Sequence, residues 1–513
     1  MNNNSIQYKI VDGLTTTFYI IFSIVLAILA SVQASLFGIY FVIGAFLIFT
    51  TLLIIIIFAD ILARRYKLDL KTPQQLFAIS IFAVFLAYVS CCMTCTLPSD
   101  TQILYDSAAA LINNGTLNVP YDYSIYYPDL GFYTLSDYFC RYPNNIAMLL
   151  ILTGIYSIGS LFGFNAGTIS GQSFAVLITA ISVAVAVHFL CKSAQYIFKS
   201  VNVYFHCLLL NILFLSYYYS SPNFYTDIWI LCPLCCGLYF AVRYYTTKKN
   251  RYAFLCSLLW AIGSQLKITV LIPLIAFCIF IVFEKENTIR NKIISLLYIT
   301  VPLLIFIYLF HTWYYNNSLF DFSRHEELYY PFTVWISYGS HGIGGYHYGD
   351  SVLAYQAPYH LRDQVVFNHI KDIFSAYSPA EYLQFMYNKL SFIWGDGLFE
   401  GGVYAQWALF ENWTNYFTNP TCHGENLVEI WTNSFAFMLV ACGLIASLIQ
   451  IKKRDNPWLL FINVLIFGFI LYLCIFEAAP RRAIPAMLFF MLDTLYLLKL
   501  LSAGIQNKYK SKI

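Results

Sequence analysis

Of the 513 residues in this chain, 59% are hydrophobic and only 11% are charged, and the formal net charge is +3. This composition excludes an ordinary soluble domain and a disordered chain, and it gives no sign of a nucleic-acid partner. The apolar residues come in runs of about twenty, the length at which a helix crosses a bilayer. Helices must carry these runs, because lipid offers the backbone no hydrogen-bond partners.

The apolar runs predict an all-α polytopic membrane protein with about twelve transmembrane helices. Three runs precede the first long polar stretch, at 14–32, 36–62 and 75–97. The later runs are 167–190, 203–219, 227–244, 252–266, 268–283, 293–313, 430–451, 458–476 and 484–501.

Basic residues orient these spans, because Lys and Arg accumulate in short cytoplasmic loops. Such loops contain Arg64 and Arg65, the segment 243–251 and the segment 452–454. We therefore expect an integral plasma-membrane protein with both termini in the cytoplasm. The chain then divides into N-terminal spans (1–97), a first extracytoplasmic loop with interfacial helices (98–166), central spans (167–315), a large extracytoplasmic loop (316–429) and C-terminal spans with a cytoplasmic tail (430–513).

One apolar stretch after the first outer loop cannot be a span. Four such stretches precede the basic segment 243–251, and four crossings that start outside would end outside. The segment 146–162 is short, contains glycines and lacks a basic flank on its far side. We expect it to lie on the outer face as an interfacial helix.

Asp100 is the first candidate for chemistry, because it follows a predicted span directly on the outer side. A helical pattern from Thr101 to Asn113 closes at Gly115, so Asp100 could simply cap this helix. It could also be a general base where a lipid-borne and a water-borne substrate meet. Asp106, six positions later, would point to a different face of the same helix and is a second-rank candidate.

Further ionisable residues fall at predicted outer turns. Asp227 lies about one helical turn into a span, Lys267 lies in a hairpin between spans, and Arg481 and Arg482 lie in a late turn. An ionisable side chain costs about 2.5–3.5 kcal/mol at mid-span, so it usually has a partner or a function. The cations could reach lipid headgroups. Together with the carboxylates on the same face, they could instead hold a lipid phosphate.

The large outer loop is rich in aromatic residues and also contains Asp350, Asp396 and Glu400. This mixture suits sugar rings, but Tyr and Trp also concentrate at the membrane interface without binding anything. His341 and His347 could bind a divalent metal, although no third ligand has convincing spacing. No cofactor is expected.

The 14 cysteines lie mainly in predicted spans, where a thiol behaves as a small apolar group. Their spacing matches neither a zinc site nor a disulfide framework. Cys140 and Cys422 are the pair expected to share the outer compartment, where they could form a disulfide.

The order of these residues resembles that of the GT-C membrane glycosyltransferases. An Asp follows an early span, a YPNN stretch (141–145) opens the interfacial helix, an Asp and then a Leu-Lys pair mark outer turns, and an E-x-x-x-R turn runs from Glu477 to Arg481. The chain is most similar to the family 39, protein O-mannosyltransferase-like group in its Gram-positive bacterial form. The resemblance covers about residues 97–501.

The resemblance implies a GT-C-like fold and transfer of a sugar from a polyprenyl-phosphate carrier to an extracytoplasmic acceptor. Asp100 takes the place of the catalytic Asp, and Lys267 and Arg481 match basic positions near the carrier phosphate, with Arg482 beside them. The further candidates for substrate contact are Asp106, Tyr142, Asn144, Asp227 and Glu477. The chain departs from the group in three ways: no second acid follows Asp100, Arg482 stands where Tyr is common, and three spans precede the catalytic loop.

This interpretation predicts an inverting transfer to a cell-wall glycan, a teichoic acid, or another glycan, lipid or protein acceptor. Two alternatives stay open. A polymerase or ligase of lipid-linked polysaccharide would have similar spans and outer arginines but would not need Asp100. A transporter of a lipid-linked substrate would carry its charges near the midplane, in repeated broken helices.

Overall fold

The computed structural model describes residues 3–66, 71–95, 99–123, 131–284, 288–418 and 423–510. Within these ranges every regular element is a helix, and β pairing is limited to isolated bridges between Cys95 and Ala408 and between Pro120 and Thr134. The all-α fold class expected from the sequence is confirmed.

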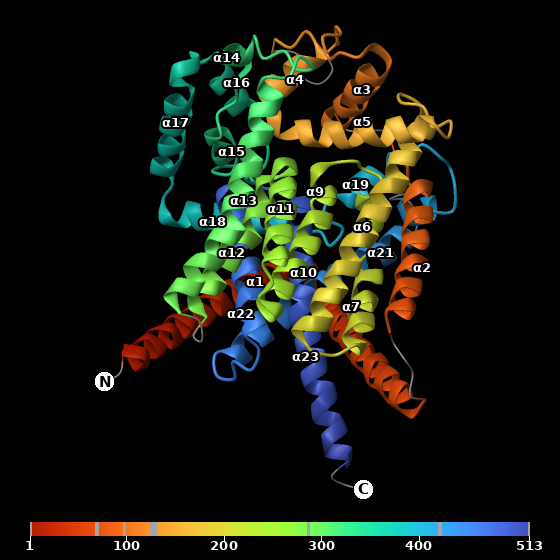
Figure 1. Ribbon diagram of the computed structural model, residues 1–513, viewed down its shortest axis with the longest axis vertical. Helices are drawn as coiled ribbons and strands as arrows, with labels where there is room; N and C mark the ends of the chain where they lie inside the picture. Colours follow the sequence, from red (N-terminus) through yellow and green to blue (C-terminus); the bar gives the residue numbers. More distant parts are fainter. Residues whose placement is uncertain are drawn as a thin grey trace.

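Helix α1 (Asn3–Arg65) replaces two separately predicted spans with one kinked helix. Gly38 forms the kink with φ 72° and ψ −178°, a conformation that side-chain-bearing residues rarely adopt. The 63 residues would extend about 95 Å, roughly three times the hydrocarbon thickness. Both ends of α1 lie at the lower end of the molecule (Figure 1), so the helix turns back at the kink. The total length leaves each arm long enough to cross a bilayer. Helix α2 (Thr72–Cys92) follows.

The segment predicted to be the first outer loop forms a layer of helices at the upper end of the bundle (Figure 1). These helices are α3 (Ser99–Asn114), α4 (Leu135–Arg141), η1 (Pro143–Asn145) and α5 (Ile146–Ser160). Helix α3 ends as the sequence predicts, because Gly115 has φ 69° and its N–H donates to the Leu111 carbonyl at 3.1 Å. Helix α5 lies across the long axis of the bundle (Figure 1), the orientation expected of a helix that does not cross.

The central segment forms the body of the bundle. Its helices are α6 (Ile169–Ile197), α7 (Asn202–Ile212), α8 (Ser216–Ser220), α9 (Thr226–Trp229), α10 (Leu231–Thr247), α11 (Asn250–Leu266), η2 (Ile268–Val270), α12 (Leu271–Phe283) and α13 (Ile289–Tyr315). The apolar run 203–219 is thus not one continuous helix, because it breaks between α7 and α8.

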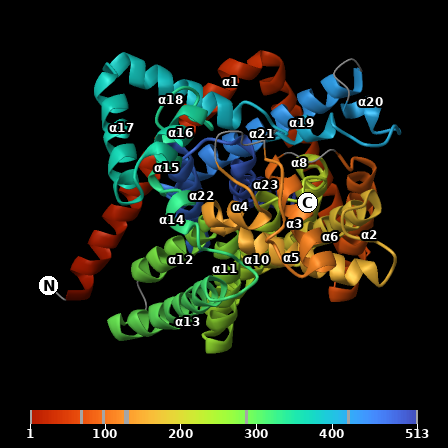
Figure 2. The same cartoon turned by 90° about the horizontal axis from the view of Figure 1, so that it is seen from above.

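The large outer loop, whose fold the sequence did not predict, consists of short helices. They are α14 (His325–Leu328), α15 (Thr333–Tyr338), α16 (Tyr348–Gln356), η3 (Tyr359–Leu361), α17 (Arg362–Ala376), α18 (Pro379–Trp394), α19 (Gly401–Ala405) and α20 (Asn415–Thr418). A small core of its own contains Tyr330, Val334, Tyr338, Ala354, Val366 and Ile370. Seen from above, α17 and α18 lie on one side and α19 and α20 on the other (Figure 2).

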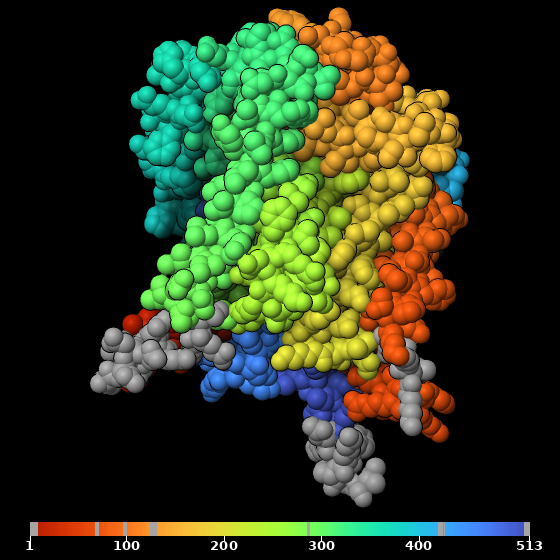
Figure 3. All heavy atoms as spheres, in the orientation of Figure 1, coloured from red at the N-terminus to blue at the C-terminus, as the bar shows by residue number. Residues whose placement is uncertain are grey.

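The C-terminal segment supplies the centre of the bundle with α21 (His423–Gln450), α22 (Pro457–Ile475), η4 (Pro480–Ala483) and α23 (Ile484–Lys510). In the most apolar stretch of η4 and α23, 83% of the residues are buried inside the protein. In the most apolar stretch of α13 only 11% are buried. Helix α13 stands on one face of the molecule (Figure 3). Because an apolar helix this exposed needs an apolar solvent, we assign its outer face to lipid.

Eight helices in the described ranges are long and apolar enough to cross a membrane. They are α1, α2, α6, the pair α9–α10, α13, α21, α22, and η4 with α23. Helix α1 is long enough for two crossings, and α7 and η2–α12 are shorter apolar segments. The count of about twelve crossings and the sidedness of the loops remain predictions.

Candidate active site

Asp100 lies in the first turn of α3, which begins one residue earlier, at Ser99. The Tyr138 hydroxyl donates to its Oδ1 at 3.0 Å, and the Tyr225 hydroxyl donates to its Oδ2 at 3.1 Å. Asn145, which is buried, donates through Nδ2 to the Tyr138 oxygen at 2.6 Å. The carboxylate is therefore oriented by α4, by η1 and by the turn before α9.

A second group of charges centres on Asp227, in the first turn of α9. Lys267 Nζ forms an ion pair with its Oδ1, and Arg481 Nε donates to its Oδ2 at 3.1 Å. Local structure favours this arrangement, because a helix start attracts negative charge and Lys267 is the C-cap of α11, where positive charge is favoured. The Asp227 side chain is only 5% exposed, so the two cations balance a charge that is almost removed from solvent.

Glu400 brings the large outer loop into this group. Its carboxylate forms an ion pair with Arg481 Nη1, which also donates to the Tyr404 hydroxyl at 3.3 Å. Phe399 and Glu400 both have positive φ, 54° and 66°, a costly conformation for residues with side chains. Asp396 holds this turn, because its carboxylate accepts the backbone N–H groups of Leu398 and Glu400 at 2.8 Å each.

Arg482 has a different partner from its neighbour. Its Nη1 donates to the Glu477 carbonyl at 2.7 Å, and its Nη2 donates to the Glu477 carboxylate at 2.5 Å. Both residues lie at η4, where adjacent side chains point about 120° apart. The structure therefore separates the two arginines, with Arg481 facing Asp227 and Glu400, and Arg482 facing Glu477.

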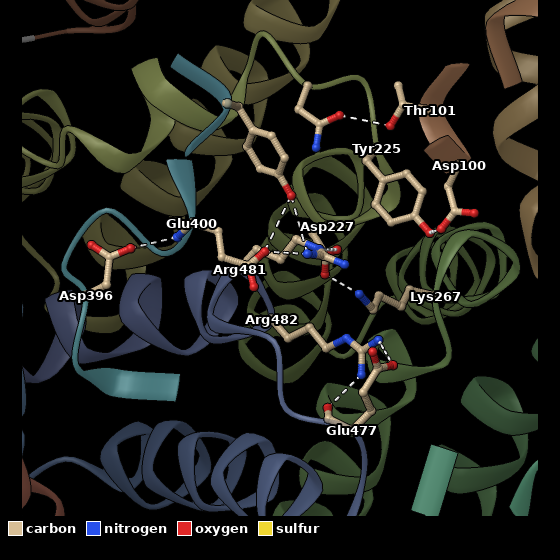
Figure 4. A network of polar contacts seen from close by, with 12 residues as sticks. Asp100, Thr101, Tyr225, Asp227, Lys267, Asp396, Glu400, Glu477, Arg481 and Arg482 are labelled. Atoms are coloured by element: carbon tan, nitrogen blue, oxygen red, sulfur yellow. Dashed lines mark hydrogen bonds and ion pairs between the residues drawn. The ribbon is translucent and has the colours of Figure 1, made fainter. Parts of the chain in front are cut away.

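Tyr225 joins Asp100 to the charged group. Its hydroxyl bonds Asp100, and the Arg481 guanidinium lies 5.7 Å from the centre of its ring (Figure 4). Burial and the neighbouring Asp100 carboxylate raise the pKa of Tyr225 well above its usual value. The phenol therefore stays protonated and remains a hydrogen-bond donor to Asp100.

The other sequence candidates lie at varying distances from this network. Asp106 belongs to a separate group, where it accepts from the Tyr121 hydroxyl at 2.7 Å. Tyr142 is adjacent, because its ring packs on that of Tyr138 with centroids 5.0 Å apart. Asn144 is exposed, and the neighbouring Asn145 contacts Tyr138 instead.

Sequence reasoning did not single out Tyr138, Tyr225 and Asn145, and it proposed Glu400 only as a contact for sugar. The signals were present but weak: Tyr225 lies two residues before Asp227, and Asn145 is the last residue of the YPNN stretch. For the disulfide hypothesis, Cys422 lies outside the described residues. Cys140 Sγ lies 3.1 Å from the Asp321 carbonyl oxygen, to which it donates.

Residues 167–311 match the model of a family described as dolichyl-phosphate-mannose-protein mannosyltransferase. The match runs from just before α6 into α13, and it includes Tyr225, Asp227 and Lys267. Among curated protein sequences, none matches this chain. The matched region is a GT-C family domain, which confirms the resemblance noted in the sequence. The match points to a membrane glycosyltransferase of the GT-C type.

Proposed function

We propose that this protein transfers a sugar from a polyprenyl-phosphate carrier to a hydroxyl group of an extracytoplasmic acceptor, with inversion at the anomeric carbon. The observation that carries the proposal is the bridge through Tyr225. The Tyr225 hydroxyl donates to the Asp100 carboxylate, and the Tyr225 ring lies next to the Arg481 guanidinium. Arg481 and Lys267 both pair with Asp227, so Asp100 and the two cations belong to one connected group. A proton acceptor linked through one side chain to a pair of cations suits sugar transfer from a phosphate ester, which needs a base for the acceptor hydroxyl and positive charge for the leaving phosphate.

In the proposed reaction, Asp100 accepts the proton of the acceptor hydroxyl as its oxygen bonds to the anomeric carbon. The bond between that carbon and the phosphate oxygen breaks, and the electron pair leaves with the phosphate. Attack opposite to the leaving group inverts the anomeric configuration. Lys267 and Arg481 stabilise the charge that builds on the phosphate, so no general acid is needed.

The carboxylates next to the cations act as positioning residues in this proposal. Asp227 is 5% exposed, whereas Lys267 is 13% and Arg481 25% exposed. The cations therefore present more surface to a ligand than the carboxylate that holds them. The Arg481 contacts to Asp227, Glu400 and Tyr404 use Nε and Nη1, and an arginine has five N–H donors in a fixed fork. A phosphate would thus meet cations whose positions are already set.

The depth of these residues supports a lipid-borne donor. Asp227 is the second residue of one candidate membrane span, Thr226–Thr247, and Arg481 is the second residue of another, Pro480–Gln506. Both side chains therefore belong to the ends of spans. A carrier whose tail lies in the bilayer would present its phosphate at a fixed depth, which lowers the entropic cost of positioning it.

The test is sugar transfer by purified protein with a panel of polyprenyl-phosphate sugars. We expect Asp100→Asn to fold and bind the donor but to lose turnover, because the amide keeps the size of the side chain and loses the base. Asp106→Asn is the matched control, since it makes the same substitution in the same helix outside the network. Near wild-type turnover of Asp100→Asn would refute the assignment of the base and favour a polysaccharide polymerase or ligase.

A further inference from the structure

Four residues of the large outer loop form a group that the proposed reaction does not use. His341, His347, Asp350 and His369, here called the histidine cluster, come from three elements. His341 lies in the turn after α15, His347 and Asp350 lie at the start of α16, and His369 lies on α17. Sequence reasoning had paired His341 with His347 and found no third ligand, because Asp350 and His369 belong to helices whose packing it did not predict.

Asp350 is the centre of the histidine cluster. His341 Nε2 lies 2.9 Å from its Oδ2, and His369 Nε2 lies 3.4 Å from its Oδ1. One ligand atom from each of these three residues lies within 4.8 Å of the other two. Ligands around a tetrahedral zinc ion are about 3.3 Å apart, given metal–nitrogen distances near 2.0 Å. The two nitrogen–oxygen separations, 2.9 and 3.4 Å, are each within about half an ångström of that value but involve different oxygens of Asp350. Binding of one ion therefore needs a small rotation of the carboxylate or of the imidazoles.

The surroundings hold the cluster in place. The Asp350 side chain is only 3% exposed, and Ser337 donates to its Oδ2 at 2.5 Å. His347 Nδ1 lies 2.9 Å from Asp350 Oδ1 and orients that oxygen from the rim, where His347 is 55% exposed. Next to Asp350, Ser351 accepts a hydrogen bond from Tyr330 at 2.7 Å, within the small core of this loop. Ligands supported by such secondary contacts need little reorganisation on binding.

We propose that His341, Asp350 and His369 bind a divalent transition-metal ion of the Zn²⁺ class. Two imidazoles and one carboxylate are a common ligand set for zinc, with a fourth position left for water. Oxygen-preferring ions such as Mg²⁺ and Ca²⁺ are disfavoured, because two of the three ligand atoms are nitrogen.

The metal would fasten the outer layer above the candidate active site. It would link the turn after α15 to α16 and α17. Through Ser351 and Tyr330, α16 is connected to Tyr142, whose ring lies 5.8 Å from that of Tyr330 and 5.0 Å from that of Tyr138. Tyr138 in turn bonds Asp100. The inference nevertheless stands apart from the proposed function, because it concerns binding and not turnover.

The experiment is Zn²⁺ titration of the full-length protein, purified in detergent through a histidine-free tag and stripped with a chelator. Isothermal titration calorimetry should show one Zn²⁺ per chain. His369→Gln should weaken Zn²⁺ binding by about a hundredfold. Loss of a residue that only supports a metal ligand already costs up to about that much in affinity, and His369 is proposed to be a ligand itself. His360→Gln is the matched control, because His360 is an exposed histidine of η3 outside the cluster, and its affinity should match that of the wild type.

A second measurement keeps the proposal testable if a variant fails to fold. Co²⁺ bound to the wild-type protein at a four-coordinate site should give a strong visible absorption band, and Zn²⁺ should abolish it. Absence of saturable Zn²⁺ binding to the wild-type protein would overturn the proposal. Equal affinities of the wild type and His369→Gln would also overturn it, because the ion would then bind elsewhere.

Discussion

Arg481→Gln separates the two tasks assigned to this arginine. In the structure Arg481 holds Asp227 and Glu400, and in the proposed reaction it also contacts the carrier phosphate. Loss of a charge-assisted hydrogen bond to phosphate costs about 1.5–3 kcal/mol. We therefore expect the affinity for polyprenyl phosphate, or the rate of transfer, to fall about 10- to 150-fold.

Arg481→Gln should also lower the stability of the fold, because Asp227 and Glu400 would both lose a partner. Asp227 would keep its ion pair with Lys267, and among the described residues Glu400 would keep the hydrogen bond from the Tyr404 hydroxyl at 3.4 Å. Because Glu400 is 20% exposed, water can replace part of the lost interaction. We expect a loss of about 1–3 kcal/mol in the free energy of unfolding, the cost of an unsatisfied partner.

A double variant distinguishes the two effects. Arg481→Gln with Glu400→Gln removes both charges, so it should regain thermal stability without regaining affinity for the carrier. Arg482→Gln is a neighbouring comparison, and it should lose less donor affinity because Arg482 faces Glu477. The assays are thermal unfolding and binding of polyprenyl phosphate in nanodiscs. Recovery of donor binding together with stability in the double variant would refute the reasoning, because Arg481 would then act only through the fold.

The remaining predictions concern the phenol and the interfacial helix. Tyr225→Phe keeps the ring near Arg481 but removes the hydroxyl bound to Asp100, so the transfer rate should fall about tenfold while donor affinity stays the same. Unchanged turnover in this variant would remove the bridge from the mechanism. Ser160→Cys, at the exposed end of α5, should react with a membrane-impermeant thiol reagent added outside. Labelling only from the cytoplasmic side would mean that α5 crosses the membrane.

The sequence by itself determined the class of protein, because hydropathy is a property of local runs. Long apolar stretches need helices in lipid whatever their neighbours are, so the all-α membrane fold was predictable. The end of α3 at Gly115 was equally local. Asp227, Lys267 and Arg481 could be singled out for the same reason, since a charge at the end of a span is costly before any partner is known.

Only the tertiary structure decided which residues meet. Arg481 contacts Asp227 from 254 positions away and Glu400 from 81, and Tyr225 reaches Asp100 across 125 positions. With 43 tyrosines in the chain, only its place two residues before Asp227 sets Tyr225 apart, and no local signal marks Tyr138 as a partner of Asp100. The histidine cluster likewise needed the packing of α16 against α17 to bring His369 to Asp350. Such pairings depend on how whole helices pack, and that is set by side-chain contacts summed over the bundle rather than by any one segment.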